Sequence, residues 1–210
     1  MGSRLRARRA RPLLSLVRDV FEVKGAVRIL DVGGLRRYWN IMPDGFLREH
    51  RVEVTLVNPL RDARQHGQGF RFVQGDGCNL SMFDDGSFDI AHSNSVLEHV
   101  GDWNRMLRFA TEVRRVAPKY FVQTPNFWFP VEPHCMAPFF HWLPRPTRIW
   151  LMMRFALGPW PRATSLDAAV RTEAEARLLN RKMMACLFPD AEILTEWFVL
   201  MPKSLVAIRK

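Results

Sequence analysis

Residues 27–34 read Val-Arg-Ile-Leu-Asp-Val-Gly-Gly, and this stretch decides the fold. A short apolar run that ends in a carboxylate and two glycines is typical of a buried parallel strand followed by a tight turn. Four more short apolar runs follow along the chain, at 52–57, 70–73, 88–92 and 119–123. Segments with apolar residues at helical spacing lie between and before them, at 12–23, 95–100 and 103–116. Strands that alternate with helices predict a doubly wound, mostly parallel α/β sheet.

The second half of the chain adds two strands and an insertion. We expect a helix at 173–187 and then an antiparallel pair at 192–200 and 204–209, which brings the sheet to seven strands. Residues 127–161 hold four of the seven tryptophans and seven prolines, and a segment so rich in proline cannot form one regular helix. It is therefore predicted to be an aromatic, proline-rich insertion after strand five, with a short helix near 148–157.

The composition is that of an ordinary globular chain. Its 210 residues are 48% hydrophobic and 25% charged, which is enough apolar content for one core. The three cysteines are far apart and odd in number, which argues against a disulfide framework and a Cys-x-x-Cys zinc site. No apolar run is long enough to span a bilayer, and the basic N-terminus has no long apolar segment. We therefore expect a cytoplasmic protein.

Much of the net charge of +10 lies at the N-terminus, because five arginines fall within the first eleven residues. We divide the chain into a basic tail at 1–11 and a single domain at 12–210, whose insertion spans 125–170. A basic tail can bind anionic lipid or nucleic acid, and it can equally be a solvated terminus. No DNA- or RNA-binding motif accompanies the charge, so a nucleic-acid partner is not expected.

Polar residues and glycines gather where the predicted strands end. Ligands of open α/β sheets bind beyond the carboxyl ends of the strands. One ligand could contact four groups at these ends, namely Asp31 with Gly33 and Gly34, Asn58, Asp76 with Gly77 and Cys78, and Ser93 with Asn94. Carboxylates also cap turns, so Asp31 and Asp76 could instead serve the fold alone.

These segments resemble the class I S-adenosylmethionine-dependent methyltransferases, especially the small bacterial type 11 group. The similar segments occur in the family's order, at 29–33, 75–77, 83–90, 95–100 and 200–208. The resemblance implies a Rossmann-like methyltransferase fold, with S-adenosyl-L-methionine as cofactor and S-adenosyl-L-homocysteine as product. The sequence has no Gly-x-Gly-x-x-Gly, P-loop or Gly-x-Ser-x-Gly signature, and the lack of the first counts against a nicotinamide dehydrogenase.

The resemblance also implies roles for the residues at the strand ends. The turn at 33–34 would approach the methionyl and ribose portion of the cofactor, and Ser93 and Asn94 would line the methionyl end. Asp31 would hold the turn or, through water, the cofactor's ammonium group. Asp76 would accept a hydrogen bond from the adenine amino group, and the amide that follows would donate to a ring nitrogen.

Three residues depart from the family pattern. Leu35 and Arg37 replace two later glycines of the glycine loop, so the loop must run differently. Strand two ends in Asn58 instead of an acid, and an amide cannot bind both ribose hydroxyls as a charged bidentate acceptor. These departures predict weaker cofactor binding, or a relative that keeps the fold without catalysis.

The acceptor side is expected in the insertion, where Glu132 and His134 stand among apolar residues. Residues i and i+2 of an extended segment point to the same side, so Glu132 can orient His134. We predict His134 as a general base and His99 as a second catalytic candidate, while a structural role for each histidine stays open. Glu98, His99 and His134 are similar to the metal ligands of small-RNA 2′-O-methyltransferases. Ser95 stands where that family has a further glutamate, so we predict no metal.

Aromatic and methionine residues of the insertion are interleaved with Arg145, Arg148 and Arg154. This pattern predicts an apolar acceptor pocket or a membrane-facing surface, unless these side chains only pack the insertion onto the sheet. We expect O-methylation of a small, lipid-linked or glycan acceptor, with a peripheral membrane contact. The alternatives are a non-catalytic binding protein with this fold and a nucleic-acid methyltransferase.

Overall fold

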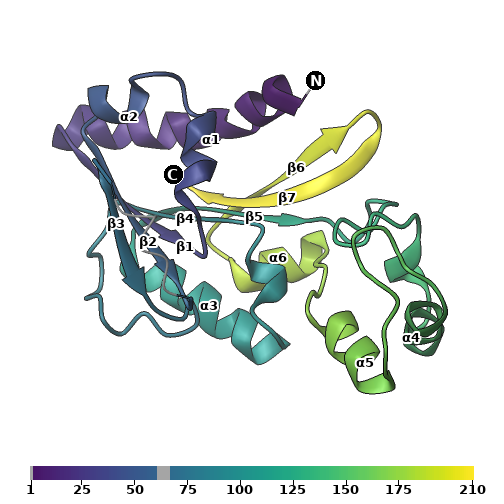
Figure 1. Ribbon diagram of the computed structural model, residues 1–210. Helices are drawn as coiled ribbons and strands as arrows, with labels where there is room; N and C mark the ends of the chain where they lie inside the picture. Colours follow the sequence, from purple (N-terminus) through teal and green to yellow (C-terminus); the bar gives the residue numbers. More distant parts are fainter. Residues whose placement is uncertain (1, 61–66) are drawn as a thin grey trace.

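The computed structural model describes residues 2–60 and 67–210, and its centre is one seven-stranded sheet (Figure 1). The strands are β1 Val27–Val32, β2 Val52–Asn58, β3 Phe70–Gln74, β4 Ile90–Asn94, β5 Lys119–Pro125, β6 Glu192–Phe198 and β7 Met201–Arg209. They lie in the order β3-β2-β1-β4-β5-β7-β6, with β7 antiparallel to both of its neighbours and the other pairs parallel. The predicted doubly wound, mostly parallel sheet is therefore confirmed.

Helices cover both faces of the sheet. α1 (Gly2–Lys24) and α2 (Phe46–Glu49) lie on one face, and α3 (Trp103–Val116) and α6 (Arg181–Leu187) lie on the other (Figure 1). Because successive strand residues point to opposite faces, Ile29 belongs to the core under α1 while Leu30 belongs to the core under α3. A strand that is buried on both faces reads as a continuous apolar run, which is why β1 stands out in the sequence.

The first helix is longer than the sequence predicts. We expected it to begin at Pro12, but α1 begins at Gly2 and carries Pro12 in its interior. Ala10 is buried against the sheet, so packing holds the helix in place before the proline is reached. Arginine and alanine are also good helix formers. The predicted start is therefore wrong, and residues 2–11 form the first half of α1.

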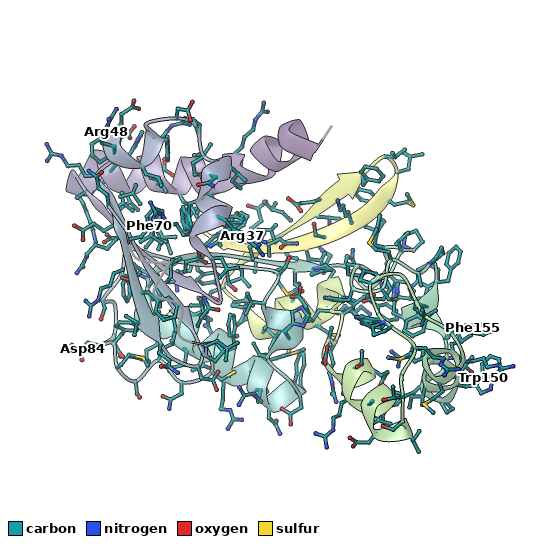
Figure 2. All side chains as sticks on the ribbon, viewed as in Figure 1. Arg37, Arg48, Phe70, Asp84, Trp150 and Phe155 are labelled. Carbon is teal, nitrogen blue, oxygen red and sulfur yellow. The ribbon has the colours of Figure 1, made fainter. Side chains whose placement is uncertain are left out.

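The insertion after β5 contains η4 (Phe140–Trp142), α4 (Arg145–Arg154) and α5 (Leu166–Ala174). It has a small core of its own around Cys135 and Met152. α4 begins three residues before the predicted 148–157, because Pro146 is placed in its first turn, where a proline costs no hydrogen bond. Trp150 and Phe155 are exposed and point outward from this helix, away from the sheet (Figure 2).

The single helix predicted at 173–187 is wrong, since α5 and α6 are separate helices. The chain between them is held in the fold, because Leu179 is fully buried and its carbonyl accepts a hydrogen bond from the Phe127 amide at 2.9 Å. Asn180 then caps α6 by accepting a hydrogen bond from the Met183 amide. A continuous helix would have to give up both contacts.

Two boundaries near the end of β4 also differ from the prediction. β4 begins at Ile90 rather than at 88, and the side chain of Asp89 accepts a hydrogen bond from the Arg28 amide at 2.7 Å. The helix expected at 95–100 is only the 3-10 turn η3 (Leu97–His99). Ser95 has a φ of 54°, a left-handed conformation that a regular helix beginning there could not include.

Candidate functional site

The glycine turn after β1 is fixed by the protein's own packing. Gly33 has a φ of 76°, and its amide donates to the Val57 carbonyl at 2.7 Å. A Cβ at Gly34 would lie 1.8 Å from the Asp31 carboxylate, so no larger residue fits there. After Leu35 the chain enters the 3-10 helix η1 (Arg36–Ile41) directly.

Asp31 is completely buried and both of its carboxylate oxygens have partners. Oδ2 accepts a hydrogen bond from Trp39 Nε1 at 2.8 Å, and Oδ1 pairs with His92 Nδ1 at 2.7 Å. These contacts tie β1, β4 and η1 together directly beside the glycine turn. These contacts support the predicted role of Asp31 in holding the turn. Its other predicted role, a water-mediated contact with the cofactor, stays a prediction.

Asn58 and Asp76 lie at the ends of β2 and β3. The Asn58 amide donates to the Gly34 carbonyl, so it links the end of β2 to the glycine turn. Asp76 accepts from the Cys78 amide at 2.9 Å and from Arg105 Nη2 at 2.8 Å. Burial raises the pKa of Asp76, but these two partners outweigh it and hold the pKa below its usual value.

Gly77 and Cys78 complete this turn. A Cβ at Gly77 would lie 2.6 Å from Val32 Cγ1, so the glycine is required by close packing. Burial raises the pKa of the Cys78 thiol to about 11, which keeps it a neutral thiol. The thiol donates to the Arg105 carbonyl at 3.3 Å. Cys78 therefore acts here as a small packing residue and not as a nucleophile.

The end of β4 offers a polar atom suited to a bound ligand. Ser93 is buried and donates to the Val32 carbonyl at 2.9 Å. Asn94 Oδ1 is a buried acceptor with no partner among the residues that the structure describes. A buried unpaired acceptor at a strand end fits the ammonium group of an amino-acid-like ligand. The residues at this edge therefore fit S-adenosyl-L-methionine, except for the missing acid at Asn58.

The structure brings together three catalytic candidates that lie far apart in the sequence. Glu132 Oε1 pairs with His134 Nδ1 at 2.6 Å, and His134 Nε2 lies 3.1 Å from His99 Nε2. Glu132 Oε2 also accepts from the His134 and Cys135 amides, each at 2.7 Å. The cluster sits just beyond the ends of β4 and β5, since η3 carries His99.

The two members of the Glu132–His134 pair favour each other's charged forms. Burial raises the pKa of Glu132, but the hydrogen bonds from His134 and the Cys135 amide outweigh it, and the pKa lies below its usual value. The hydrogen bond with Glu132 raises the pKa of His134. His134 is therefore a stronger base than a free imidazole.

Glu98 completes the cluster; in the sequence it was noted in a metal-ligand pattern but was given no catalytic or binding role. It is 1% exposed, and its Oε2 accepts from Thr124 Oγ1 at 2.9 Å. Burial raises the pKa of this carboxyl group. Its position directly before His99 was the signal available in the sequence. His92, the partner of Asp31, was also missed, although a histidine inside an apolar strand is unusual enough to mark it.

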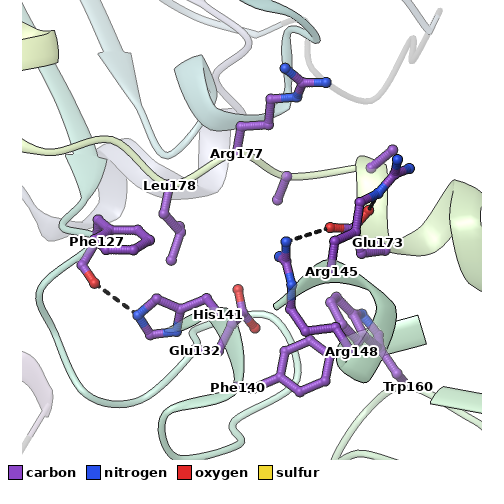
Figure 3. A pocket seen from close by; sticks show the side chains of 12 residues that line it. Phe127, Glu132, Phe140, His141, Arg145, Arg148, Trp160, Glu173, Arg177 and Leu178 are labelled. Atoms are coloured by element: carbon purple, nitrogen blue, oxygen red, sulfur yellow. Dashed lines mark hydrogen bonds and ion pairs between the residues drawn. The ribbon is translucent and has the colours of Figure 1, made fainter. Parts of the chain in front are cut away.

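A cavity of about 370 Å³ lies on the insertion side of Glu132 (Figure 3). Arg145 and Arg148 both bind Glu173, at 2.9 and 2.8 Å, while Arg177 points away from it. Aromatic side chains supply the apolar part of the wall, namely Phe127, Phe140 and Trp160. His141 also lines the cavity, and burial lowers the pKa of its ring.

Comparison with known proteins agrees with this geometry. A family model described as a methyltransferase domain matches residues 45–119, from the start of α2 to the start of β5. None of the curated proteins matches the chain.

Solved structures share the whole fold at low identity. A SAM-dependent methyltransferase from Archaeoglobus fulgidus is 13% identical with a TM-score of 0.59, over 99% of this chain and 94% of that one. An O-methyltransferase family protein from Burkholderia thailandensis is 12% identical with a TM-score of 0.52, over 97% of this chain and 57% of that one. A SAM-dependent methyltransferase from Methanosarcina mazei is 15% identical with a TM-score of 0.51, over 88% of this chain and 92% of that one.

The sheet order and its antiparallel β7 define the Rossmann-like fold of class I methyltransferases. The chain therefore has the Rossmann-like methyltransferase fold, and residues 45–119 within it match the methyltransferase domain. The resemblance seen in the sequence is confirmed. The individual roles predicted for the strand-end residues, and for Glu132, His134 and His99, stay predictions.

Proposed function

We propose that this chain is an S-adenosylmethionine-dependent methyltransferase that acts on an oxygen atom of a small acceptor, which is lipid-linked or a glycan. The observation that carries the proposal is the contact chain Glu132–His134–His99 at the ends of β4 and β5. Bound S-adenosyl-L-methionine supplies a methyl group on a sulfonium, which is already a strong electrophile. The protein therefore has to align the acceptor, exclude water and remove a proton.

His134 is the proposed base. Because Glu132 binds Nδ1, the opposite ring nitrogen, Nε2, keeps a lone pair that faces His99 and can take a proton. A hydroxyl group has a high pKa and needs such a base when it attacks the methyl group. Glu132 orients the ring and stabilises the imidazolium that forms, as the aspartate does for the histidine of a Ser-His-Asp triad.

The cavity beside Glu132 supports an acceptor with a negative charge. Arg145 and Arg148 line the cavity, and the single carboxylate of Glu173 neutralises only part of their combined charge. A phosphate or carboxylate on the acceptor would neutralise the rest. The aromatic wall can pack against a sugar ring or an acyl chain.

An exposed apolar hairpin tip supports a membrane contact. Val199 and Leu200, between β6 and β7, are 78% and 87% exposed, and Trp197 beside them is 62% exposed. Phe198 lies 6.5 Å from Phe129 between ring centroids, which links the tip to the start of the insertion. No helix within residues 2–60 and 67–210 is both long and apolar enough to cross a bilayer. An apolar tip of this size suits a surface contact with lipid.

One observation favours the non-catalytic alternative. Asn58 already donates to the Gly34 carbonyl, and an amide in this place binds ribose hydroxyls less strongly than an acid. If cofactor binding were lost, the remaining fold could act as a binding protein. Affinity for S-adenosyl-L-homocysteine therefore separates the two functions.

Methyl transfer from labelled S-adenosyl-L-methionine to fractionated lipid and oligosaccharide extracts tests the proposal. We expect label in an O-methyl product, with no transfer by His134→Ala. Binding of S-adenosyl-L-homocysteine without transfer to any fraction would favour the non-catalytic protein. Salt-sensitive binding to RNA that survives removal of residues 1–11 would favour a nucleic-acid methyltransferase.

A second assay tests the membrane contact by sedimentation with vesicles that contain phosphatidylglycerol. Replacing Val199 and Leu200 together by serine should release the protein from the vesicles and leave its stability unchanged. Equal sedimentation of the variant and the parent would place the contact elsewhere or exclude it. Replacing the exposed residues Val23 and Leu60, away from the hairpin, gives the matched control.

A further inference from the structure

We propose that Glu98, His99 and His134 form a binding site for one divalent transition-metal ion, with Zn²⁺ as the reference ion. One ligand atom from each residue lies within 4.8 Å of the other two. We predicted no metal from the sequence, because Ser95 offers no carboxylate. The structure nevertheless supplies two imidazoles and a carboxylate, a donor set that suits zinc and its neighbours in the first transition series.

The two histidines are fixed in the tautomer that a metal requires. His134 Nδ1 donates to Glu132 Oε1 at 2.6 Å, and His99 Nδ1 donates to the Glu175 carbonyl at 2.9 Å. Metal-binding histidines are typically held in this way, by a carboxylate or carbonyl on the nitrogen that does not bind the metal. Both Nε2 atoms are then left with lone pairs.

These two lone pairs face each other at 3.1 Å, which is unfavourable unless a cation lies between them. Zinc–nitrogen bonds of about 2.1 Å in a tetrahedral site place two nitrogens about 3.4 Å apart. The observed separation needs only a small adjustment to accept an ion. A shared proton is the other cation that could lie there, and the experiment below separates the two.

Glu98 supplies the independent observation. Its Oε2 accepts from Thr124, while Oε1 is buried and has no hydrogen-bond partner among the described residues. A buried carboxylate oxygen without a partner is costly, because it has lost its water and gained nothing in exchange. Coordination of a cation would satisfy Oε1 together with both imidazole lone pairs.

Three protein ligands leave at least one coordination position free, which is the arrangement of catalytic rather than structural sites. An ion here could bind the oxygen of an acceptor hydroxyl and lower its pKa, with the proton released to water. The ion site goes beyond the proposed function, and an ion on His134 Nε2 would occupy the lone pair that the proposed base uses. In the ion-bound chain the ion would therefore replace His134 as the group that activates the acceptor hydroxyl. A chain that binds the ion and transfers no methyl group would support this site and overturn that function.

The test is titration of the metal-free full chain with Co²⁺ and Zn²⁺, followed by visible absorption and by calorimetry. We expect one ion for each chain, with bands of nitrogen and oxygen ligands. The variants His99→Ala, His134→Ala and Glu98→Gln should each weaken binding by about tenfold or more. His50→Ala, which changes a histidine stacked on Phe46 away from the cluster, should bind as the parent does.

Four outcomes would overturn the proposal, three of the titration and one of the nitrogen chemical shifts. One is the absence of stoichiometric binding, and another is binding that the His99 and His134 variants leave unchanged. A thiolate-to-cobalt band would place the ion at the free cysteines. Nitrogen chemical shifts of the histidine rings are measured on the unsubstituted chain, so a variant that fails to fold cannot affect this result. Zn²⁺ should move both Nε2 signals, whereas shifts that respond to pH alone would show that a proton holds the pair.

Discussion

Two carboxylate–imidazole pairs in this protein have nearly the same contact and opposite surroundings. Asp31–His92 spans 2.7 Å and is completely buried under α1, while Glu132–His134 spans 2.6 Å in the insertion. The second nitrogen of His92 has no hydrogen-bond partner among the described residues, and Tyr38, Trp39 and Phe121 surround its ring. The second nitrogen of His134 faces the exposed His99.

The comparison teaches that the pair itself does not decide its role. A buried pair enclosed by aromatic rings holds strands and a turn together, because its side chains are shielded from solvent. The same pair at the mouth of the sheet has a free lone pair that can bind a proton or an ion. The predictions below test this division, from the largest expected effect to the smallest.

His134→Ala should reduce the turnover number by about 10²–10⁴-fold, because the proposed base is lost. Affinity for S-adenosyl-L-homocysteine should stay within about threefold, since His134 lies on the acceptor side. Steady-state kinetics and calorimetry measure the two quantities. His50→Ala, which changes a histidine stacked on Phe46 across the sheet, should leave both unchanged. An equal loss of turnover and cofactor affinity would make His134 structural.

Asp31→Ala should lower the free energy of unfolding by about 3–5 kcal/mol, because it removes one partner of a buried pair and leaves Trp39 Nε1 unpaired. Urea unfolding measures the loss. Asp31→Asn keeps one acceptor and should cost less, while the exposed Asp84→Ala should stay within about 0.5 kcal/mol of the parent. If Asp31→Ala were as stable as the parent, the structural reading of the first pair would be wrong.

Asp76 is a third carboxylate to compare with the two pairs; it is half-exposed and forms an ion pair with Arg105. The prediction concerns its replacement by alanine. If Asp76 also binds the adenine amino group, its loss should weaken S-adenosyl-L-homocysteine binding by about tenfold. Calorimetry at fixed salt measures this affinity. Unchanged affinity would show that the adenine site lies elsewhere and that Asp76 serves only its turn.

The smallest expected effect is the loss of stability on replacing Glu112, and this loss should depend on pH. Its hydrogen bond with Arg115 lowers the pKa of the carboxyl group below the ordinary 4.5, and it also accepts from the Leu80 amide at 2.6 Å. A lowered folded-state pKa contributes stability that is complete above the ordinary pKa and is lost as pH falls through the folded value. Glu112→Gln should cost about 1–2 kcal/mol at neutral pH. The difference from the parent should shrink in acid, and a constant difference would contradict this reading.

The sheet could be predicted from the sequence because each strand is decided locally. β1 and β2 read as apolar runs closed by glycine or proline, and the antiparallel pair at the end follows the same logic. The helices were harder to place. Burial of Ala10 carries α1 past Pro12, and the contact between Leu179 and Phe127 divides the last helical segment. Both effects come from residues distant in the chain, so no local pattern contains them.

The candidate site shows the same limit. The Glu132–His134 pair was predicted from the side shared by residues two apart in an extended segment, but residues 133–135 form a turn, in which Glu132 Oε2 accepts from the His134 and Cys135 amides. The pair's contact with His99 and the convergence of Glu98 depend on how the insertion folds back over η3. The resemblance to other metal ligands grouped Glu98 and His99 with His134, but no local pattern in the sequence placed the three side chains in contact.

The most direct test of the account is a crystal structure of the chain with S-adenosyl-L-homocysteine. We predict that the ligand lies across the ends of β1, β2 and β4, with its amino group near Asn94 Oδ1 and its sulfur facing His99 and His134. An empty strand edge at saturating ligand, or a ligand bound away from the two histidines, would contradict the account.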